Sequence, residues 1–285
     1  MQILVATDFS VRSDRALRRA SLIGRKLGAS LTLLHVVDAD LPDPLAAAET
    51  SAASAILEDS VQTLRSHDGI AADWLVNVDD VDAGILAAAD DVAADLIVIG
   101  PHRNRLRDVF VGTTAERVVQ RSLRPLLVAV ETPSTHHRRT LLALNFDEAS
   151  KAAGREALAL GLFDHTEVVV MHAFDAPAEH LLKRSMEQAE TIARYVDAEG
   201  EAAADKLRTL RDELGLPPTC QTIVSVKGSP ARTILESAQS AGSDLIVVGA
   251  SQRQGFERAL IGSVTANVIR DAHRDILIVP VSAGE

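Results

Sequence analysis

The strongest indication of the fold is Asp95-Leu96-Ile97-Val98-Ile99-Gly100, a short apolar run that ends in a glycine. The same pattern returns in the second half of the chain as Asp244-Leu245-Ile246-Val247-Val248-Gly249. A repeat over this distance indicates that one structural unit is built twice. Residues 5–9 and 142–146 form another matched pair, earlier in each half, and support the same duplication.

Each half alternates short apolar runs with longer helix-like stretches. In the first half we expect strands at residues 3–7, 30–37, 73–78, 96–99 and 126–130, and helices at about 12–27, 45–67, 82–93 and 113–122. In the second half we expect strands at about 140–145, 166–173, 220–226, 245–248 and 276–280, and an enlarged helical stretch at 179–214 that Gly200 interrupts or kinks. Buried strands that alternate with helices are typical of a parallel sheet covered on both faces. Right-handed crossovers then favour an α/β fold with two doubly wound parallel five-stranded sheets, arranged as a tandem repeat.

The length of 285 residues suits two domains of about 100–200 residues each. We place them at residues 1–132 and 138–285, because the polar, proline-containing stretch Glu131-Thr132-Pro133-Ser134-Thr135-His136-His137 is typical of a link. Its histidines favour a solvated connector over a metal site. The apolar last strands, 126–130 and 276–280, are predicted to pair the halves into an internal mimic of a homodimer. Assembly into a true homodimer is left open.

Composition and charge exclude several classes of protein. Hydrophobic residues make up 47% and charged residues 24% of the chain, which is typical of a globular protein. No apolar stretch approaches the roughly 18 residues of a membrane-spanning helix, and the first residues show no signal-peptide pattern, so we expect a cytoplasmic protein without a membrane partner. The net charge of −11 disfavours nucleic acid. The single cysteine, Cys220, excludes an internal disulfide.

In a doubly wound sheet, ligands bind beyond the carboxyl ends of the strands, where the strand order reverses. In the first half, the loops after residues 7, 37 and 99 would line this crevice. Asp8 follows the first strand and can accept hydrogen bonds from a base or a ribose. Gly100 opens the loop that leads to Gly112 and Thr113, where the free N–H groups at the start of a helix form a phosphate site.

The second half offers a matching set of candidate residues. Gly249 opens the corresponding loop, which reaches Gly262 and Ser263 at the start of a helix. Gly262 lets a phosphate approach the backbone closely. Ser263 can donate its hydroxyl to that phosphate or can simply cap the helix. Asn145 stands where Asp8 stands in the first half.

Both halves, and so nearly the whole chain, resemble the universal stress protein family, in the order of its tandem two-domain members. The resemblance rests on Ile3-Leu4-Val5-Ala6-Thr7-Asp8-Phe9-Ser10, on residues 94–100, on Gly112-Thr113-Thr114-Ala115-Glu116-Arg117-Val118, on Arg124-Pro125-Leu126-Leu127-Val128 and on Gly228-Ser229-Pro230. It implies an adenine nucleotide alpha hydrolase-like fold and a role in stress survival. The family's ATP-binding members carry an Asp after the first strand and a loop of Gly, two residues, Gly, nine residues, Gly, then Ser or Thr.

The chain departs from this family pattern in both halves. In the first half Arg103 stands where the second loop glycine is expected, and Gly112 arrives one residue early. In the second half the loop spacing is kept, but Gln252 and Asn145 replace the glycine and the aspartate. The resemblance implies ATP or AMP as the ligand, with Mg²⁺ if it is ATP, and the second half fits better than the first. The candidate binding residues are Asp8, Val36, Gly100, Arg103, Gly112, Thr113, Asn145, Ala173, Gly249, Gln252, Gly262 and Ser263.

The sequence lacks the signatures of common enzyme classes. It contains no P-loop, no G-x-G-x-x-G, no G-x-S-x-G and no H-E-x-x-H, so we assign no catalytic and no metal-binding residue. His35 and His172 fall at equivalent strand ends and are expected to pack and hydrogen-bond. We expect a non-enzymatic stress-response protein that binds an adenine nucleotide in a degenerate site. One alternative is a nucleotide-dependent switch or slow ATPase that uses the second-half site; another is a carrier of a small apolar or non-nucleotide metabolite beneath residues 179–214.

Overall fold

Strands and helices alternate along the chain in the predicted order. The computed structural model describes residues 1–101, 114–174, 184–185, 188–217, 221–225, 229–252 and 262–282. The first half contains β1 (Gln2–Ala6), α1 (Val11–Leu27), β2 (Ser30–Asp38), α2 (Asp43–Ser66), β3 (Ala72–Asp79), α3 (Val81–Asp91), β4 (Leu96–Ile99), α4 (Thr114–Arg121) and β5 (Leu126–Val128). The second half contains β6 (Arg139–Ala143), α5 (Glu148–Ala159), β7 (Glu167–Phe174), α7 (Ala189–Glu213), β8 (Gln221–Ser225), α8 (Pro230–Ala241), β9 (Leu245–Gln252), α9 (Ser263–Asp271) and β10 (Asp275–Ser282).

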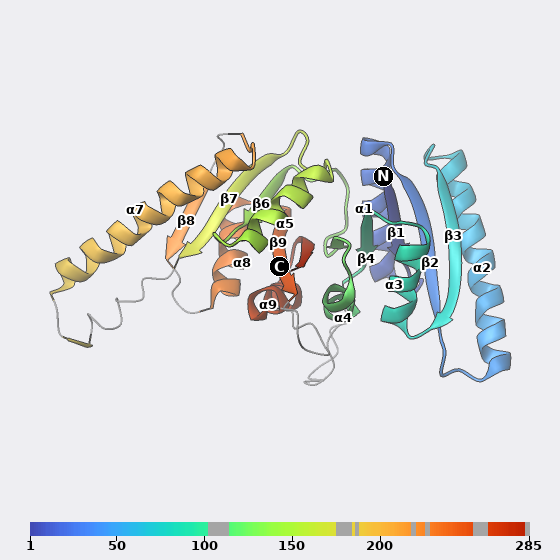
Figure 1. Cartoon of the computed structure of the whole chain (residues 1–285). Coiled ribbons are helices and arrows are strands. Elements are labelled where there is room, and N and C mark those ends of the chain that lie inside the picture. Colours follow the sequence, from blue (N-terminus) through green and yellow to red (C-terminus); the bar gives the residue numbers. More distant parts are fainter. Residues whose placement is uncertain are drawn as a thin grey trace.

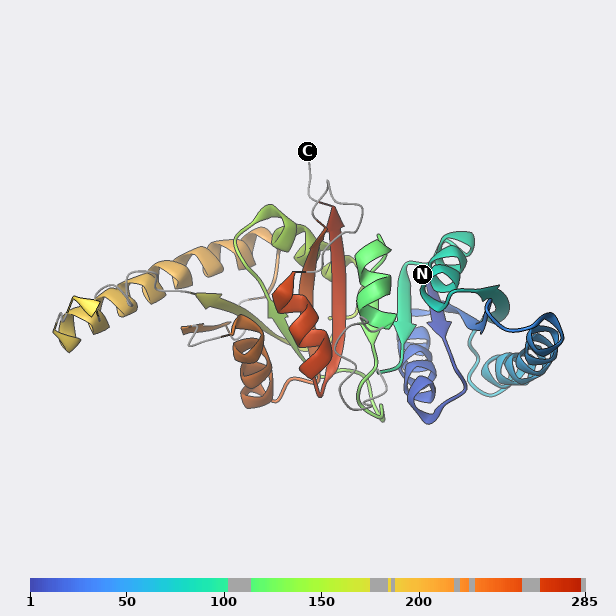
Figure 2. The ribbon, with the colours of Figure 1, turned by 90° about the horizontal axis from the view of Figure 1, so that it is seen from below.

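The described strands form one 10-stranded sheet in the order β3-β2-β1-β4-β5-β10-β9-β6-β7-β8. Within each half all neighbouring strands are parallel. The predicted α/β fold with two doubly wound five-stranded units is therefore confirmed, and the structure adds that the units share one continuous sheet. The first half lies to the right and the second half to the left in both ribbon views (Figures 1 and 2).

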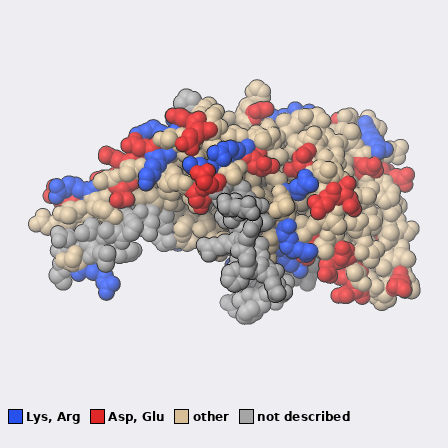
Figure 3. Space-filling model, viewed as in Figure 1, with Lys and Arg blue, Asp and Glu red and all other residues tan. Residues whose placement is uncertain are grey.

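Helices cover both faces of the sheet. α1, α2, α5 and α7 contribute to one hydrophobic core, and α3, α4, α8 and α9 contribute to the other. Side chains alternate between the two along β1, since Ile3 and Val5 join the first core and Leu4 joins the second. Charged side chains spread over the outer surface of both halves (Figure 3). In the described part of the chain, no helix is long and apolar enough to cross a membrane.

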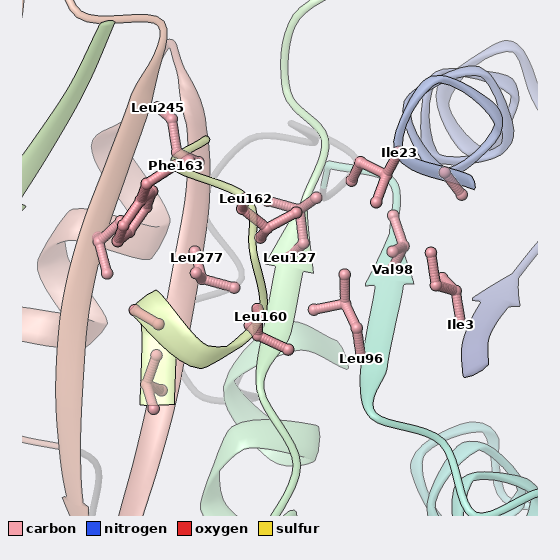
Figure 4. Packing of buried hydrophobic residues seen from close by; sticks show 14 of the residues in the cluster. Ile3, Ile23, Leu96, Val98, Leu127, Leu160, Leu162, Phe163, Leu245 and Leu277 are labelled. Carbon is pink, nitrogen blue, oxygen red and sulfur yellow. The ribbon is translucent and has the colours of Figure 1, made fainter. Parts of the chain in front are cut away.

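The two halves meet through their last strands, as the sequence predicts. β5 and β10 pair antiparallel, with Leu127 opposite Leu277 and one further pair on each side. These two leucines hold equivalent places in the repeat, so a pseudo-twofold axis passes between them, as in an isologous dimer. Both are fully buried, and Figure 4 shows them close to Leu160 and Leu162 of the second half. The pairing also removes an apolar edge that each half would otherwise expose.

α7 departs from its predicted form. The helix runs unbroken through Gly200, so the expected interruption there is wrong. A Cβ at Gly200 would lie 3.4 Å from Cζ of Phe174, so the glycine lets α7 pass close to β7. The N-terminal part of α7 projects beyond the sheet in both ribbon views (Figures 1 and 2).

A buried ionic cluster ties the link to both halves. Asp275, at the start of β10, is fully buried, and its Oδ2 accepts hydrogen bonds from Arg19 Nε at 2.7 Å and from His137 Nε2 at 2.9 Å. Its Oδ1 accepts from the backbone N–H groups of Val130 at 2.8 Å and Glu131 at 3.0 Å. His137 is only 8% exposed, so the expectation of a solvated connector is wrong for this residue. The link is part of the interface between the halves.

Candidate functional site

The predicted crevice of the first half lies at the carboxyl ends of β1, β2 and β4. It is a cavity of about 370 Å³, and the predicted residues Asp8, Val36 and Gly100 line it. The first turns of α1, α3 and α4 also line it. The free N–H groups of three helix starts concentrate partial positive charge, which favours an anionic ligand.

Asp8 organises the turn between β1 and α1. Its Oδ1 accepts hydrogen bonds from the backbone N–H of Ser10 at 3.1 Å and from the Ser10 hydroxyl at 2.5 Å. Partial burial raises the pKa of Asp8, but hydrogen bonds from Ser10 and Ser13 and the charge of Arg12 outweigh it and lower the pKa below the ordinary 3.8. The carboxylate is therefore ionised at neutral pH. It is 62% exposed, so it stays accessible from the crevice.

The second half has a matching crevice at the carboxyl ends of β6, β7 and β9. It is a cavity of about 350 Å³, lined by the predicted residues Asn145, Ala173, Gly249 and Gly262. The first turns of α5, α8 and α9 line it, as their counterparts line the first crevice. The two repeats therefore build cavities of similar size from equivalent elements.

The turns of the two crevices carry their carboxylates at different positions. Asn145 takes the place of Asp8; its Oδ1 accepts from the backbone N–H of Asp147 at 2.8 Å, and its Nδ2 donates to Asp147 Oδ2 at 2.9 Å. Asp147 also caps α5 by accepting from the backbone N–H of Ser150 at 2.7 Å. The carboxylate that Asn145 lacks is thus present two residues further on, at the place that Ser10 holds in the first half.

The three described loop glycines, Gly100, Gly249 and Gly262, differ in what a Cβ at each position would contact. A Cβ at Gly100 would lie 2.6 Å from the carbonyl oxygen of Arg12, so the loop could not rest on the first turn of α1 with any other residue. A Cβ at Gly249 would lie 3.0 Å from the Cβ of Ala153. At Gly262 no described atom lies within 4 Å of that position. Packing among the described residues therefore explains the first two glycines and does not explain Gly262.

His35 and His172 share one structural role, and His35 has a further contact, from Nε2 to Oε1 of Glu49 at 3.1 Å. Nδ1 of His35 donates to the carbonyl of Thr7, and Nδ1 of His172 donates to the carbonyl of Leu144, both at 2.9 Å. Each ring also packs on the phenylalanine of the adjoining turn, with centroids 4.6 and 4.1 Å apart. Burial lowers the pKa of His172, which favours its neutral form. These contacts agree with the expectation that both histidines pack and hydrogen-bond at the edge of the crevice.

Some predicted site residues cannot be placed in these crevices. Arg103, Gly112 and Thr113, together with the side chain of Gln252, lie outside the described residues. Ser263 begins α9, but Gly262 is the N-cap and no side-chain hydrogen bond caps this helix within the described chain, so the capping role for Ser263 is wrong.

Sequence reasoning missed several residues that line these crevices, among them Arg12, Asp147 and Thr265. Arg12 lines the first cavity, and Asp147 lines the second. Thr265 also lines the second cavity, and its hydroxyl donates to the carbonyl of Gly249 at 3.0 Å, which ties the first turn of α9 to the end of β9. A comparison of Asp8-Phe9-Ser10 with Asn145-Phe146-Asp147 carried the signal for Asp147.

The apolar space expected beneath α7 is filled in part by side chains. Phe174 and Ala203 are buried against each other, and Tyr195 and Val196 pack on them. Residues 175–183 and 186–187 of this region lie outside the described chain.

Comparison with known proteins decides the family. The universal stress protein family matches the chain twice, at residues 1–129 and again at 136–280. The chain belongs to the universal stress protein family. As a tandem universal stress protein it is similar over its whole length to Rv2005c of Mycobacterium tuberculosis, with 23% identity over 304 residues that cover 97% of this chain and 96% of that protein.

Solved structures agree with the fold of this universal stress protein. A universal stress protein from Archaeoglobus fulgidus superposes with a TM-score of 0.73 and 17% identity, covering 98% of each chain. Another universal stress protein, solved in complex with cAMP, aligns with 51% of this chain and 98% of its own, at 20% identity and a TM-score of 0.32.

Proposed function

We propose that this universal stress protein is a cytoplasmic, non-enzymatic binding protein that takes an adenine nucleotide, ATP or AMP, in its crevices and acts in the stress response. The observation that carries the proposal is the open space at Gly262. Its φ of −55° is accessible to any residue, and no described atom would contact its Cβ. Neither the backbone nor packing among the described residues requires a glycine here. A phosphate held against the N–H groups of α9 would require one.

The chemistry of both crevices supports binding over catalysis. The histidine beside each crevice uses Nδ1 to hold a backbone carbonyl, and its ring is covered by a phenylalanine. Neither Asp8 nor Asp147 is free of local bonds, because each organises its own turn. These groups are suited to fixing the shape of a pocket and to accepting hydrogen bonds from a ligand. The N-terminal ends of the nearby helices carry partial positive charge, which favours the negative charge of a phosphate.

Replacing Gly262 by Asp tests this proposal. We expect isothermal titration of the wild-type protein with Mg-ATP, and then with AMP, to show binding. In Gly262→Asp the second crevice should lose affinity by at least about tenfold, because a carboxylate would occupy the place of a phosphate and repel it. The fold should be retained, since no described atom lies within 4 Å of the new Cβ.

Pro42→Asp is the matched control, because it also adds a carboxylate at a helix N-cap, that of α2, away from both crevices. We expect it to bind nucleotide as the wild type does. Equal affinity and stoichiometry in Gly262→Asp and wild type would refute the assignment of the second site. Absence of binding to the wild type up to millimolar nucleotide would refute the proposal as a whole.

A further inference from the structure

We propose that Arg12 makes the first crevice selective for phosphorylated ligands, by contacting the phosphate directly. This inference rests on the proposed function, namely that the crevices bind an adenine nucleotide. Arg12 lies in the first turn of α1 and lines the cavity of about 370 Å³. Among the described residues that line the two crevices, it is the one Lys or Arg.

The backbone geometry places Arg12 where the phosphates of a nucleotide would lie. The carbonyl oxygen of Arg12 would be 2.6 Å from a Cβ on Gly100, so the first turn of α1 abuts the point where the chain leaves β4. Thr114 and Ala115, at the start of α4, line the same cavity. A cation on α1 and the positive end of α4 thus border one space, and both favour an anion there.

The guanidinium of Arg12 is held loosely. In the described chain its ion pair is with Asp8, at 3.6 Å between Nη2 and Oδ2, and the two side chains are 36% and 62% exposed. An exposed pair at this distance contributes little to stability. A guanidinium binds phosphate through two parallel hydrogen bonds, which are shorter and stronger. Arg12 can therefore turn from the Asp8 carboxylate to a phosphate without giving up a strong ion pair.

The second crevice lacks the cation of the first. Ala149 takes the place of Arg12 in the repeat, while Asn145 and Asp147 take the places of Asp8 and Ser10. The second turn therefore loses the positive charge and keeps one carboxylate, which is moved by two residues. The overall charge of the protein does not attract phosphate. The chain carries a net charge of −11, and acidic side chains are prominent on the first half in Figure 3. Selectivity for phosphate in the first crevice must come from local groups.

The test isolates the first crevice by using Gly262→Asp as the parent protein. Titration with ATP, AMP and adenosine should show affinity rising with the number of phosphates. Adding Arg12→Ala should lower the affinity for ATP by about tenfold or more, because a charge-assisted hydrogen bond is lost. Adenosine affinity should change by less than about twofold. Arg12→Lys should retain part of the ATP affinity, because it keeps the charge and loses the planar fork.

Arg18→Ala is the matched control, because it removes one positive charge from the same helix at an exposed position outside the crevice. We expect it to bind ATP as the parent does. Unchanged ATP affinity in Arg12→Ala would overturn the inference, and so would an equal loss of ATP and adenosine affinity, which would mean that Arg12 only supports the turn. If the wild type binds nucleotide but Gly262→Asp binds none, the inference fails while the proposed function survives. If the wild type binds none, both fail.

Discussion

Replacement of Asp275 by Asn is expected to lower the free energy of unfolding by about 3–5 kcal/mol. The Arg19 guanidinium, whose side chain is 4% exposed, would remain buried opposite a neutral amide. His137 would lose the carboxylate that it contacts at 2.9 Å. Asn has nearly the same volume as Asp, so the loss would report the missing charge and no new cavity. Chemical denaturation at neutral pH measures this difference.

Two further variants separate the buried cluster from ordinary ion pairs. Glu236→Gln removes one partner of the exposed pair with Arg232, and it should cost less than about 0.5 kcal/mol. Adding Arg19→Gln to Asp275→Asn should recover part of the loss, because the unpaired charge is then removed. A cost for Asp275→Asn no larger than that for Glu236→Gln would contradict the view that this cluster holds the halves together.

The same cluster predicts how stability depends on pH. Burial alone raises the pKa of Asp275, but the hydrogen bond from His137 and the charge of Arg19 outweigh it and hold the pKa below 3.8. A carboxyl with a lowered native pKa stabilises the fold fully above its unfolded pKa, and this contribution is lost as pH falls through the native value. The difference in unfolding free energy between wild type and Asp275→Asn should therefore be constant above about pH 5 and shrink below about pH 4. A difference that grows on acidification would contradict this assignment.

Replacement of Gly100 by Ala is expected to cost about 3 kcal/mol, at the upper end of overpacking effects. The new Cβ would lie 2.6 Å from the carbonyl oxygen and 2.8 Å from the carbonyl carbon of Arg12, and backbone atoms in a helix cannot move aside cheaply. The loop or the first turn of α1 would have to shift. Thermal or chemical denaturation measures the loss.

The other loop glycines provide graded controls for Gly100. Gly249→Ala meets the Cβ of Ala153 at 3.0 Å and the Cα of Ser150 at an ordinary 3.9 Å, and it should cost less. Gly262→Ala meets no described atom and should leave stability within about 0.5 kcal/mol of wild type. Equal losses at the three positions would show that close contact with the backbone does not explain Gly100. The expected order would separate the glycines that serve packing from Gly262, where we propose that a phosphate binds.

The periodic features of this protein were predictable from sequence. The repeated stretches at 95–100 and 244–249 contain the start of the fourth strand of each unit. They were predictable because an apolar run bounded by Asp and Gly is typical of a short buried strand. The last strands were predicted to pair, and Leu127 lies opposite Leu277. The course of α7 through Gly200 was not predictable, because helix propensity carries no information about Phe174, which the glycine accommodates.

The candidate site was predictable only in outline. The strand ends located both crevices, and the structure brings Asp8, Val36 and Gly100 to one and Asn145, Ala173, Gly249 and Gly262 to the other. The reason for each glycine was not predictable, because it depends on atoms of another element. The same sequence signal covers Gly100, which packing requires, and Gly262, whose Cβ would contact none of the described residues.

Sequence patterns were sufficient to predict the duplicated α/β units, their parallel strands and the crevice at the end of each, because these follow from the period of hydrophobic residues along the chain. The way the units join at Asp275 became visible only in the folded molecule, where residues from α1, the link and β10 meet. The folded molecule also shows that Arg12 borders the first crevice. Local patterns record which face of an element is buried. They do not record which charged groups, distant in the chain, meet when those faces pack.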